Sequence, residues 1–200
     1  MATLTRSGIG RGVPYEPPPE LAALSLGQLA EQVAARKLPP IDQWSPQDVG
    51  DSEMRIAADG RWYHQGGEIR RPAMVRAFSS LLVRDDSGQH WLVTPFQKLS
   101  IEVEDAAFIA TDMQATVDAQ GRAVLAFRLN SDDLVICGPD HPLRVTGTHD
   151  VPAFYLSVRH GTEARLNRST YGQLIEHALA IGGSELAVES QGARFVLVPA

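Results

Sequence analysis

The sequence has little cysteine, no long hydrophobic run and no excess of positive charge. Cys137 is the only cysteine among 200 residues, which excludes an intrachain disulfide and a cysteine-rich zinc site. No apolar run approaches the roughly 20 residues of a membrane-spanning helix, and no hydrophobic segment of the secretory type follows the N-terminus. We therefore expect a cytoplasmic protein with no membrane partner.

The charge balance bears on the class of partner. The net charge is -6 and the isoelectric point about 5.5, which argues against a nucleic-acid partner because phosphates require a surface rich in lysine and arginine. Apolar residues make up 44% and charged residues 21% of the chain, values typical of a soluble globular protein. The length allows one large domain or two small ones, and the oligomeric state stays open.

Motifs for a metal, a cofactor or a catalytic nucleophile are also missing. There is no GxSxG turn and no HExxH run. His141, His149 and His160 lie near Asp140 and Asp150, but their spacing fits no familiar zinc site. The single cysteine lies in an apolar run, where a thiol usually serves as inert packing. We predict neither a metal nor a cofactor.

Residues 59–82 carry the clearest structural pattern. Asp59-Gly60 is typical of a hairpin turn, residues 61–64 suit a strand, and Pro72 suits a first helical turn. Apolar residues then follow at helical spacing, namely Met74, Val75, Phe78, Leu81 and Leu82. This stripe predicts a helix over residues 72–83.

The same pattern recurs 97 residues later, where Arg168 stands in the place of Arg71. Tyr171, Leu174, Ile175, Ala178 and Leu179 form a second helical stripe, and each predicted helix is followed by a strand that ends in proline. We interpret this as an internal repeat of a strand–turn–helix–hairpin unit. Two copies are too few for a solenoid, so we expect a packed pair of halves.

The remaining sequence favours many short strands. We predict an α+β fold, mainly antiparallel β with a few helices, because most connections are short. Residues 1–20 form a flexible arm in this interpretation, 21–108 an N-terminal helix with the first unit, and 109–200 a β-rich part with the second. The N-terminal helix should occupy residues 25–37, with Ser25 and Gln28 at capping-box spacing.

Four segments together resemble an uncharacterised proteobacterial family, a domain of unknown function. They are GRWYHQGGEIRR, TPFQKLSIEVEDAAF, HPLRV and VRHGTEARLNRSTYGQL, in this order. The resemblance implies a mixed, mainly β fold with repeated motifs. It implies no established activity, and a part in signalling or regulation has been considered for the family. The matching positions of interest are Trp62, His64, Gly66, Arg71, Lys98, Glu104, Asp105, His141, Arg159 and Arg168. This chain has Ala106-Ala107 where the family pattern leads us to expect a proline.

The predicted helix starts suggest an anion site. Arg71 precedes Pro72 and no capping side chain stands there, so free backbone N–H groups and a guanidinium could bind a carboxylate or phosphate. Arg168 repeats the feature at the second helix. The alternative is that an internal carboxylate of Glu102, Glu104 or Asp105 occupies the site.

These observations lead to a preferred hypothesis and to rivals. We expect a non-enzymatic module that binds a small anion or a protein partner, near Arg71, Arg168, His64 and Glu104, with Trp62 or Tyr155 as an apolar wall. The rival is a hydrolase or isomerase acting on a small acidic metabolite, with His64 or His141 as general base and Glu104 as its orienter. The third hypothesis is a purely scaffolding protein, in which these charged residues only hold the two halves together.

Overall fold

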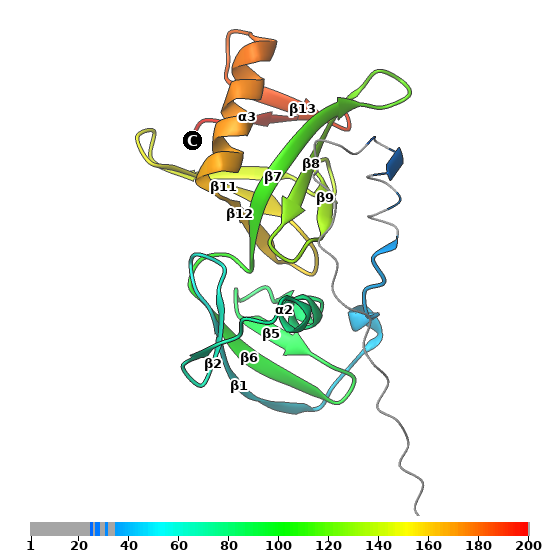
Figure 1. The fold of residues 1–200 in the computed structure, drawn as a ribbon, viewed down its shortest axis with the longest axis vertical. Helices are drawn as coiled ribbons and strands as arrows, with labels where there is room; N and C mark the ends of the chain where they lie inside the picture. The colour runs from blue at the N-terminus through cyan, green and yellow to red at the C-terminus, as the bar shows by residue number, and fades with distance from the viewer. Residues whose placement is uncertain (1–24, 26, 29–30, 32–34, 200) are drawn as a thin grey trace, which may run out of the picture.

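The computed structural model describes residues 25, 27–28, 31 and 35–199, which form two similar halves (Figure 1). The first half, after a short 3-10 turn η2 (Ile41–Gln43), is a six-stranded sheet in the order β3-β2-β1-β6-β5-β4 with one helix. Its elements are β1 (Asp48–Ile56), β2 (Trp62–His64), β3 (Gly67–Glu68), α2 (Pro72–Ser79), β4 (Leu82–Arg84), β5 (His90–Val93) and β6 (Gln97–Val103).

The second half is a six-stranded sheet in the order β10-β11-β12-β7-β8-β9, with one helix and a separate β13-β14 hairpin. Its elements are β7 (Phe108–Val117), β8 (Ala123–Leu129), β9 (Leu134–Ile136), β10 (Leu143–Gly147), β11 (Pro152–Ser157), β12 (Glu163–Leu166), α3 (Arg168–Ile181), β13 (Ala187–Ser190) and β14 (Ala193–Val196). The α+β class is confirmed.

The sheets are mixed rather than antiparallel throughout. In the first half β1 pairs in parallel with β6, and in the second half β7 pairs in parallel with β12, while the other pairs are antiparallel. A parallel pair needs a long connection, and here several strands of the same half lie between the partners along the chain. The predicted antiparallel pairing is wrong for these two pairs, because it considered only the short connections between consecutive strands.

The expected first hairpin is confirmed. Met54 pairs with His64 and Ile56 with Trp62 across the Asp59-Gly60 turn, where Gly60 has a φ of +83°. Helix α2 begins at Pro72, and the backbone of Arg71 is extended without a side-chain cap. The helix ends at Ser79 rather than near residue 83, because the chain turns there into β4.

Helix α3 begins at Arg168, close to its predicted start. Unlike α2, it has a side-chain cap. The Asn167 side chain accepts a hydrogen bond of 2.8 Å from the Thr170 N–H, and Gly182 ends the helix with a φ of +74°. Leu174 and Ala178 are buried. The hairpin after α3 forms its own small sheet, whereas the strands after α2 join the first sheet, so the two units do not match in full.

The apolar stripes are narrower than the sequence predicts. Met74 in α2 is 38% exposed and Leu179 in α3 is 66% exposed. Val75 and Phe78 do pack against the core from α2. The outer residues of each stripe lie beyond the face that meets the sheet, because a short helix against a sheet covers only part of its circumference.

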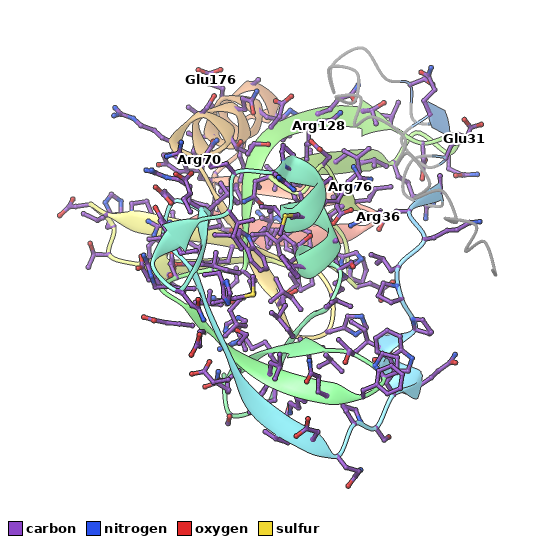
Figure 2. The ribbon with its side chains drawn as sticks, turned by 60° about the horizontal axis from the view of Figure 1, so that its bottom comes forward. Glu31, Arg36, Arg70, Arg76, Arg128 and Glu176 are labelled. Atoms are coloured by element: carbon purple, nitrogen blue, oxygen red, sulfur yellow. The ribbon has the colours of Figure 1, made fainter. Side chains whose placement is uncertain are left out.

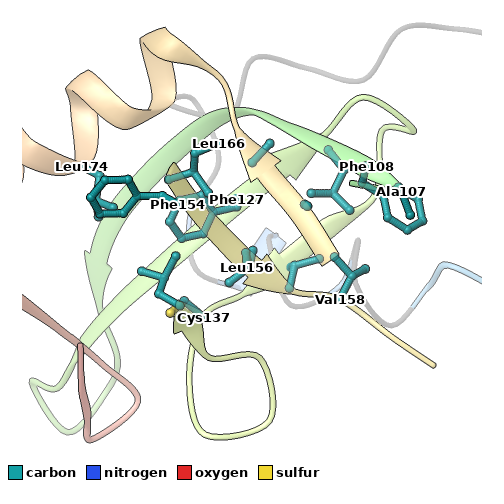
Figure 3. Close-up of a cluster of buried hydrophobic side chains, with 14 of the residues drawn as sticks. Ala107, Phe108, Phe127, Cys137, Phe154, Leu156, Val158, Leu166 and Leu174 are labelled. Atoms are coloured by element: carbon teal, nitrogen blue, oxygen red, sulfur yellow. The ribbon is translucent and has the colours of Figure 1, made fainter. Parts of the chain in front are cut away.

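One cluster of buried apolar side chains runs through both halves. In the second half it joins the inner face of the sheet to α3 (Figure 3). The ring centroids of Phe154 and Tyr171 lie 5.0 Å apart there, and those of Trp62 and Phe78 lie 6.2 Å apart in the first half. A shared core indicates that the halves are stabilised together.

Only part of the expected N-terminal helix can be compared. The Ser25 N–H donates to Gln28 Oε1 at 2.8 Å and the Gln28 N–H to Ser25 Oγ at 3.3 Å, which confirms the capping box. The rest of that helix is mostly outside the described residues, as is the predicted arm of residues 1–20.

Candidate functional site

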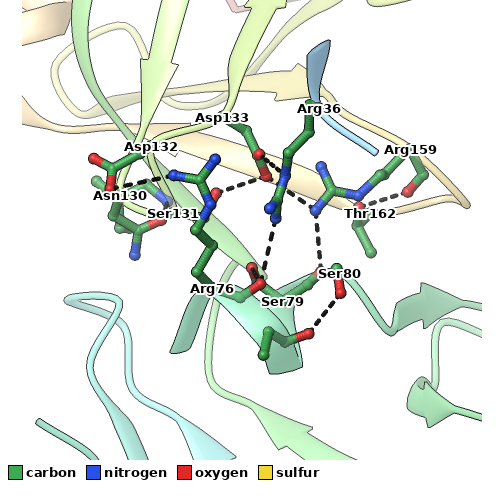
Figure 4. Close-up of polar contacts among 12 residues, drawn as sticks. Arg36, Arg76, Ser79, Ser80, Asn130, Ser131, Asp132, Asp133, Arg159 and Thr162 are labelled. Atoms are coloured by element: carbon green, nitrogen blue, oxygen red, sulfur yellow. Dashed lines mark hydrogen bonds and ion pairs between the residues drawn. The ribbon is translucent and has the colours of Figure 1, made fainter. Parts of the chain in front are cut away.

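Helix α2 lies between its own sheet and the second half (Figure 1). The buried carboxylate of Asp133 lies at this interface. The Asp133 side chain is 3% exposed, and its oxygens lie 2.5 Å from Arg36 Nε and 3.1 Å from Arg159 Nη2 (Figure 4). The hydroxyl of Ser131 donates a third contact at 2.9 Å. Asp133 is therefore paired with two cations, as buried charges generally require.

The same arginines also reach the C-terminal end of α2. Arg36 donates to the Arg76 carbonyl at 3.3 Å, and Figure 2 shows the two side chains on the same side of the molecule. Arg159 donates to the Ser79 carbonyl at 3.1 Å. Cations are favourable at this end of a helix because its carbonyl groups carry partial negative charge. Arg159, a candidate for ligand binding, thus joins the halves in this structure.

A close backbone contact also joins the two halves. The Arg84 N–H donates to the His160 carbonyl at 2.8 Å. Gly161 follows with a φ of +75°, and a Cβ built on it would lie 2.4 Å from the Arg84 carbonyl oxygen. This position requires glycine both for its conformation and for the close approach.

One cavity, which we call the Arg168 cavity, opens between the Asp59-Gly60 turn and the start of α3. Its volume is about 540 Å³, within the usual range of ligand pockets. Asn130 bridges the halves here, accepting from the Ile109 N–H at 3.0 Å and donating to the Gly60 carbonyl at 3.4 Å. The lining residues are Ala58, Asp59, Ile109, Thr111, Asn130, Pro152, Ala153, Phe154, Arg165, Leu166, Asn167, Arg168 and Tyr171.

Arg168 supplies the uncompensated charge of this cavity. It is exposed, and within the described part of the chain it has no ion-pair partner. Because the Asn167 side chain caps the Thr170 N–H, the N–H groups of Arg168 and Ser169 lack an acceptor among the described residues. Free donors and a positive helix end favour a bound anion.

The other charges of the Arg168 cavity are internally paired. Arg165 lies 2.5 Å from Asp105, and Asp59 accepts a hydrogen bond of 2.7 Å from Arg61 Nε. The backbone N–H of Arg61, followed by its guanidinium, lowers the pKa of Asp59. Arg168 therefore remains as the excess positive charge of the lining.

A second, more polar cavity of about 290 Å³ also lies between the halves, and we call it the Arg84 cavity. Its polar lining comprises Arg84, His90, Asp105, Arg144, Tyr155 and Glu163. Arg144 donates two hydrogen bonds to Glu163, at 3.0 and 2.9 Å, and its guanidinium lies over the Tyr155 ring at 4.7 Å. The Tyr155 hydroxyl donates to Asp105 at 2.7 Å, and the pKa of Tyr155 is raised by burial and by this carboxylate.

The two helix starts do not share one cavity. Arg71 is exposed and lines neither the Arg168 cavity nor the Arg84 cavity. Trp62 is 2% exposed, belongs to the core and lines neither of these two cavities, whereas Tyr155 does line the Arg84 cavity. The crevice expected between Arg71 and Arg168 is therefore replaced by a cavity that Arg168 lines and Arg71 does not, because the start of α2 at Pro72 lines a different cavity, with Ser131 and Asp132 of the second half.

The remaining predicted residues are dispersed. Glu104 contacts Arg55 and accepts from the Ala58 N–H at 2.9 Å, so it does not orient a histidine. His64 is exposed on β2. Two further candidates have separate partners: Lys98 Nζ lies 4.1 Å above the Trp91 ring, and His141 Nδ1 lies 3.2 Å from the Ser157 carbonyl oxygen.

Sequence reasoning missed Arg84, Arg144 and Arg165. Arg165 alternates with Glu163 along β12, so a strand assigned there would have placed both on one face of the sheet. No strand was predicted for residues 163–166. Arg84 carried no local signal, because Arg144, Tyr155 and Glu163, which line its cavity, come from the second half of the chain.

Cys137 is fully buried, and burial raises the pKa of its thiol to about 12. Since the thiolate is the reactive form, we expect the folded protein not to react with a thiol reagent such as Ellman's reagent at neutral pH. The unfolded chain should react with one equivalent, because only one cysteine is present. Fast reaction of the native protein would contradict this burial.

Two searches of the described residues are negative. Within residues 25, 27–28, 31 and 35–199, no group of three or more His, Cys, Asp or Glu side chains is arranged to hold a metal ion. Within the same residues, neither helix has the length and apolar character required to cross a membrane.

Comparison with known proteins identifies both halves. Residues 39–106 match "Domain of unknown function (DUF1285), N-terminal domain", and residues 107–197 match "Protein of unknown function (DUF1285), C-terminal domain". No protein with a curated description matches the chain.

Two crystal structures are similar to this chain. A DUF1285 family protein from Silicibacter pomeroyi DSS-3 has 35% sequence identity and a TM-score of 0.72, over 88% of this chain and 96% of that one. A DUF1285 family protein from Shewanella baltica OS155 has 25% identity and a TM-score of 0.49, over 62% of this chain and 90% of that one. The family matches and the first of these structures show that the chain belongs to the DUF1285 family.

Proposed function

We propose that this chain is a non-enzymatic, cytoplasmic binding module with a regulatory role, and that its ligand is a small anion with an apolar part. The ligand would occupy the Arg168 cavity. The observation that carries the proposal is the exposed guanidinium of Arg168, unpaired within the described chain, at a helix start whose first N–H groups have no acceptor there. A carboxylate or phosphate would satisfy all of these donors together.

The rest of the lining supports the apolar part of the ligand. Ile109, Phe154 and Leu166 contribute apolar surface, while Thr111 and Tyr171 contribute hydroxyl groups at the same cavity. A few polar groups that fix orientation within a mainly apolar lining are typical of small-molecule sites. An arylalkyl carboxylate is the simplest compound with both features.

The cavity also depends on both halves. The Asp59-Gly60 turn approaches the second half so closely that a Cβ on Gly60 would lie 2.7 Å from both the Asn130 amide nitrogen and Ile109. A ligand in the cavity would therefore contact a turn of the first half and a helix start of the second. Binding would stabilise the native state in which these halves are packed.

The test is calorimetric titration with phenylacetate and with phenyl phosphate as probes. We expect Arg168→Ala to weaken binding of the bound probe at least about tenfold, equivalent to about 1.4 kcal/mol. Arg168→Lys should retain part of the affinity, because it keeps the charge but loses the planar fork.

Arg71→Ala is the matched control, since Arg71 is an exposed arginine at the start of the other helix and does not line this cavity. Its affinity should equal that of the wild type. Undiminished affinity in Arg168→Ala, or an equal loss in Arg71→Ala, would contradict the proposed location.

A further inference from the structure

We propose that the Arg84 cavity is a second, separate site, which binds a small oxyanion, a carboxylate or a sulfate-like or phosphate group, through the guanidinium of Arg84. This inference goes beyond the function proposed above, because the cavity and the cationic residue are different. It rests on the pairing of the charges around the cavity, on the fixed backbone of Arg84 and on the surroundings of His90.

The carboxylates near this cavity are already engaged. Glu163 accepts both hydrogen bonds from Arg144, and Asp105 accepts from Tyr155 and Arg165. Asp85 directly follows Arg84, but it accepts from Ser87 and from the Trp91 indole, contacts that lower its pKa to about 2. Neither of the carboxylates that line the cavity, Asp105 and Glu163, is left unpaired to neutralise Arg84.

Arg84 itself has no ion-pair or hydrogen-bond partner for its guanidinium among the described residues. Its backbone is nevertheless fixed, because its N–H donates to the His160 carbonyl across the interface. The guanidinium lies close to Gly88, where an added Cβ would be 3.4 Å from Nη2. Because the backbone of Arg84 is already fixed and its guanidinium is unpaired within the described chain, binding of an anion would cost the side chain little conformational freedom.

His90 is the antiparallel partner of Arg84 and lines the same cavity. Its ring has no hydrogen-bond partner within the described chain. Burial, followed by the charge of Arg84, lowers the pKa of His90, while Asp85 and Glu163 act in the opposite direction. Arg144 lines the same cavity from β10, but Glu163 neutralises it.

An anion bound between these groups would change the protonation of His90. It would add negative charge beside the imidazole and so raise the pKa of His90 towards or above its ordinary value. Protonation and anion binding would then favour each other, and affinity should increase as the pH falls. The cavity is small and polar, which favours a compact anion without an apolar part.

The test is calorimetric titration of the full chain with sodium sulfate and, separately, with sodium malonate. The sulfate and malonate titrations distinguish a tetrahedral oxyanion from a carboxylate. We expect at least one of them to bind, and its affinity to be about threefold or more higher near pH 6 than near pH 8, on either side of the ordinary histidine pKa.

Arg84→Ala should weaken that binding at least about tenfold, whereas Arg84→Lys should retain part of it. Arg71→Ala should leave it unchanged, because Arg71 is exposed and lines neither cavity. His90→Gln should abolish the pH dependence between about pH 6 and about pH 8. Arg84 is exposed at the surface, so these variants are expected to fold, and circular dichroism checks this.

Several results would overturn the proposal. They are the absence of binding by both anions in the wild type, undiminished binding in Arg84→Ala, and an equal loss in Arg168→Ala. The last result would place the anion in the other cavity. Failure here would leave the phenylacetate and phenyl phosphate titrations of the Arg168 cavity unaffected, because those depend on Arg168 and not on Arg84.

Discussion

Replacing Asp133 by alanine is expected to lower the free energy of unfolding by about 3–5 kcal/mol. The Asp133 side chain is 3% exposed, and the side chains of Arg36 and Arg159 that face it are 19% and 13% exposed. Removing the carboxylate leaves two largely buried guanidinium groups without their counterion. It also removes the carboxylate that holds both arginines in place for their hydrogen bonds to the carbonyl groups at the end of α2.

Chemical denaturation followed by circular dichroism measures this effect. Asp150→Ala is the matched control, since the Asp150 side chain is 98% exposed and surface substitutions usually change stability by less than about 0.5 kcal/mol. If Asp133→Ala were as stable as Asp150→Ala, the cluster at the end of α2 would not hold the halves together.

Replacing Gly161 by alanine is expected to cost about 2–5 kcal/mol, the sum of a left-handed backbone and an overpacked contact. The φ of Gly161 is +75°, and the new Cβ would lie 2.4 Å from the carbonyl oxygen of Arg84. Backbone atoms cannot move aside as a flexible side chain can. The two halves would therefore have to separate slightly at β4.

Gly192→Ala is a control that separates the cost of the left-handed backbone from the cost of the overpacked contact. Its φ is +78°, yet a Cβ there would meet nothing within 4 Å. Gly192→Ala should therefore cost only about 1–2 kcal/mol, the backbone part alone. Thermal or urea unfolding of both variants gives the difference, and equal losses would mean that the halves are not in tight contact at Gly161.

Features determined by neighbouring residues could be predicted from the sequence. The Asp59-Gly60 hairpin, the uncapped start of α2 at Pro72 and the end of α3 at Gly182 all depend on the conformational preferences of glycine and proline. The parallel pairs β1–β6 and β7–β12 join strands that are distant along the chain. No local pattern specifies such a pairing, so the sequence could not provide it.

The candidate site shows the same division. Arg168 stands out in the sequence because it occupies the start of a helix, and the structure places it at a cavity of about 540 Å³. Trp62 was expected as one possible wall of a ligand site but is buried against Phe78 of α2, because strand alternation alone does not reveal which face of the strand a helix covers. Arg84 and Arg165 have their surroundings supplied by the other half or by a distant strand, so only the assembled structure makes them candidates.

The most direct test of the central claim is a titration of the isotope-labelled protein with phenylacetate, followed through its backbone amide NMR signals. If the ligand binds in the Arg168 cavity, the largest shifts should occur at the free N–H groups of Arg168 and Ser169 and at the Asp59-Gly60 turn. Shifts confined to other surfaces, or no shifts at all, would contradict a binding site between the two halves at the start of α3.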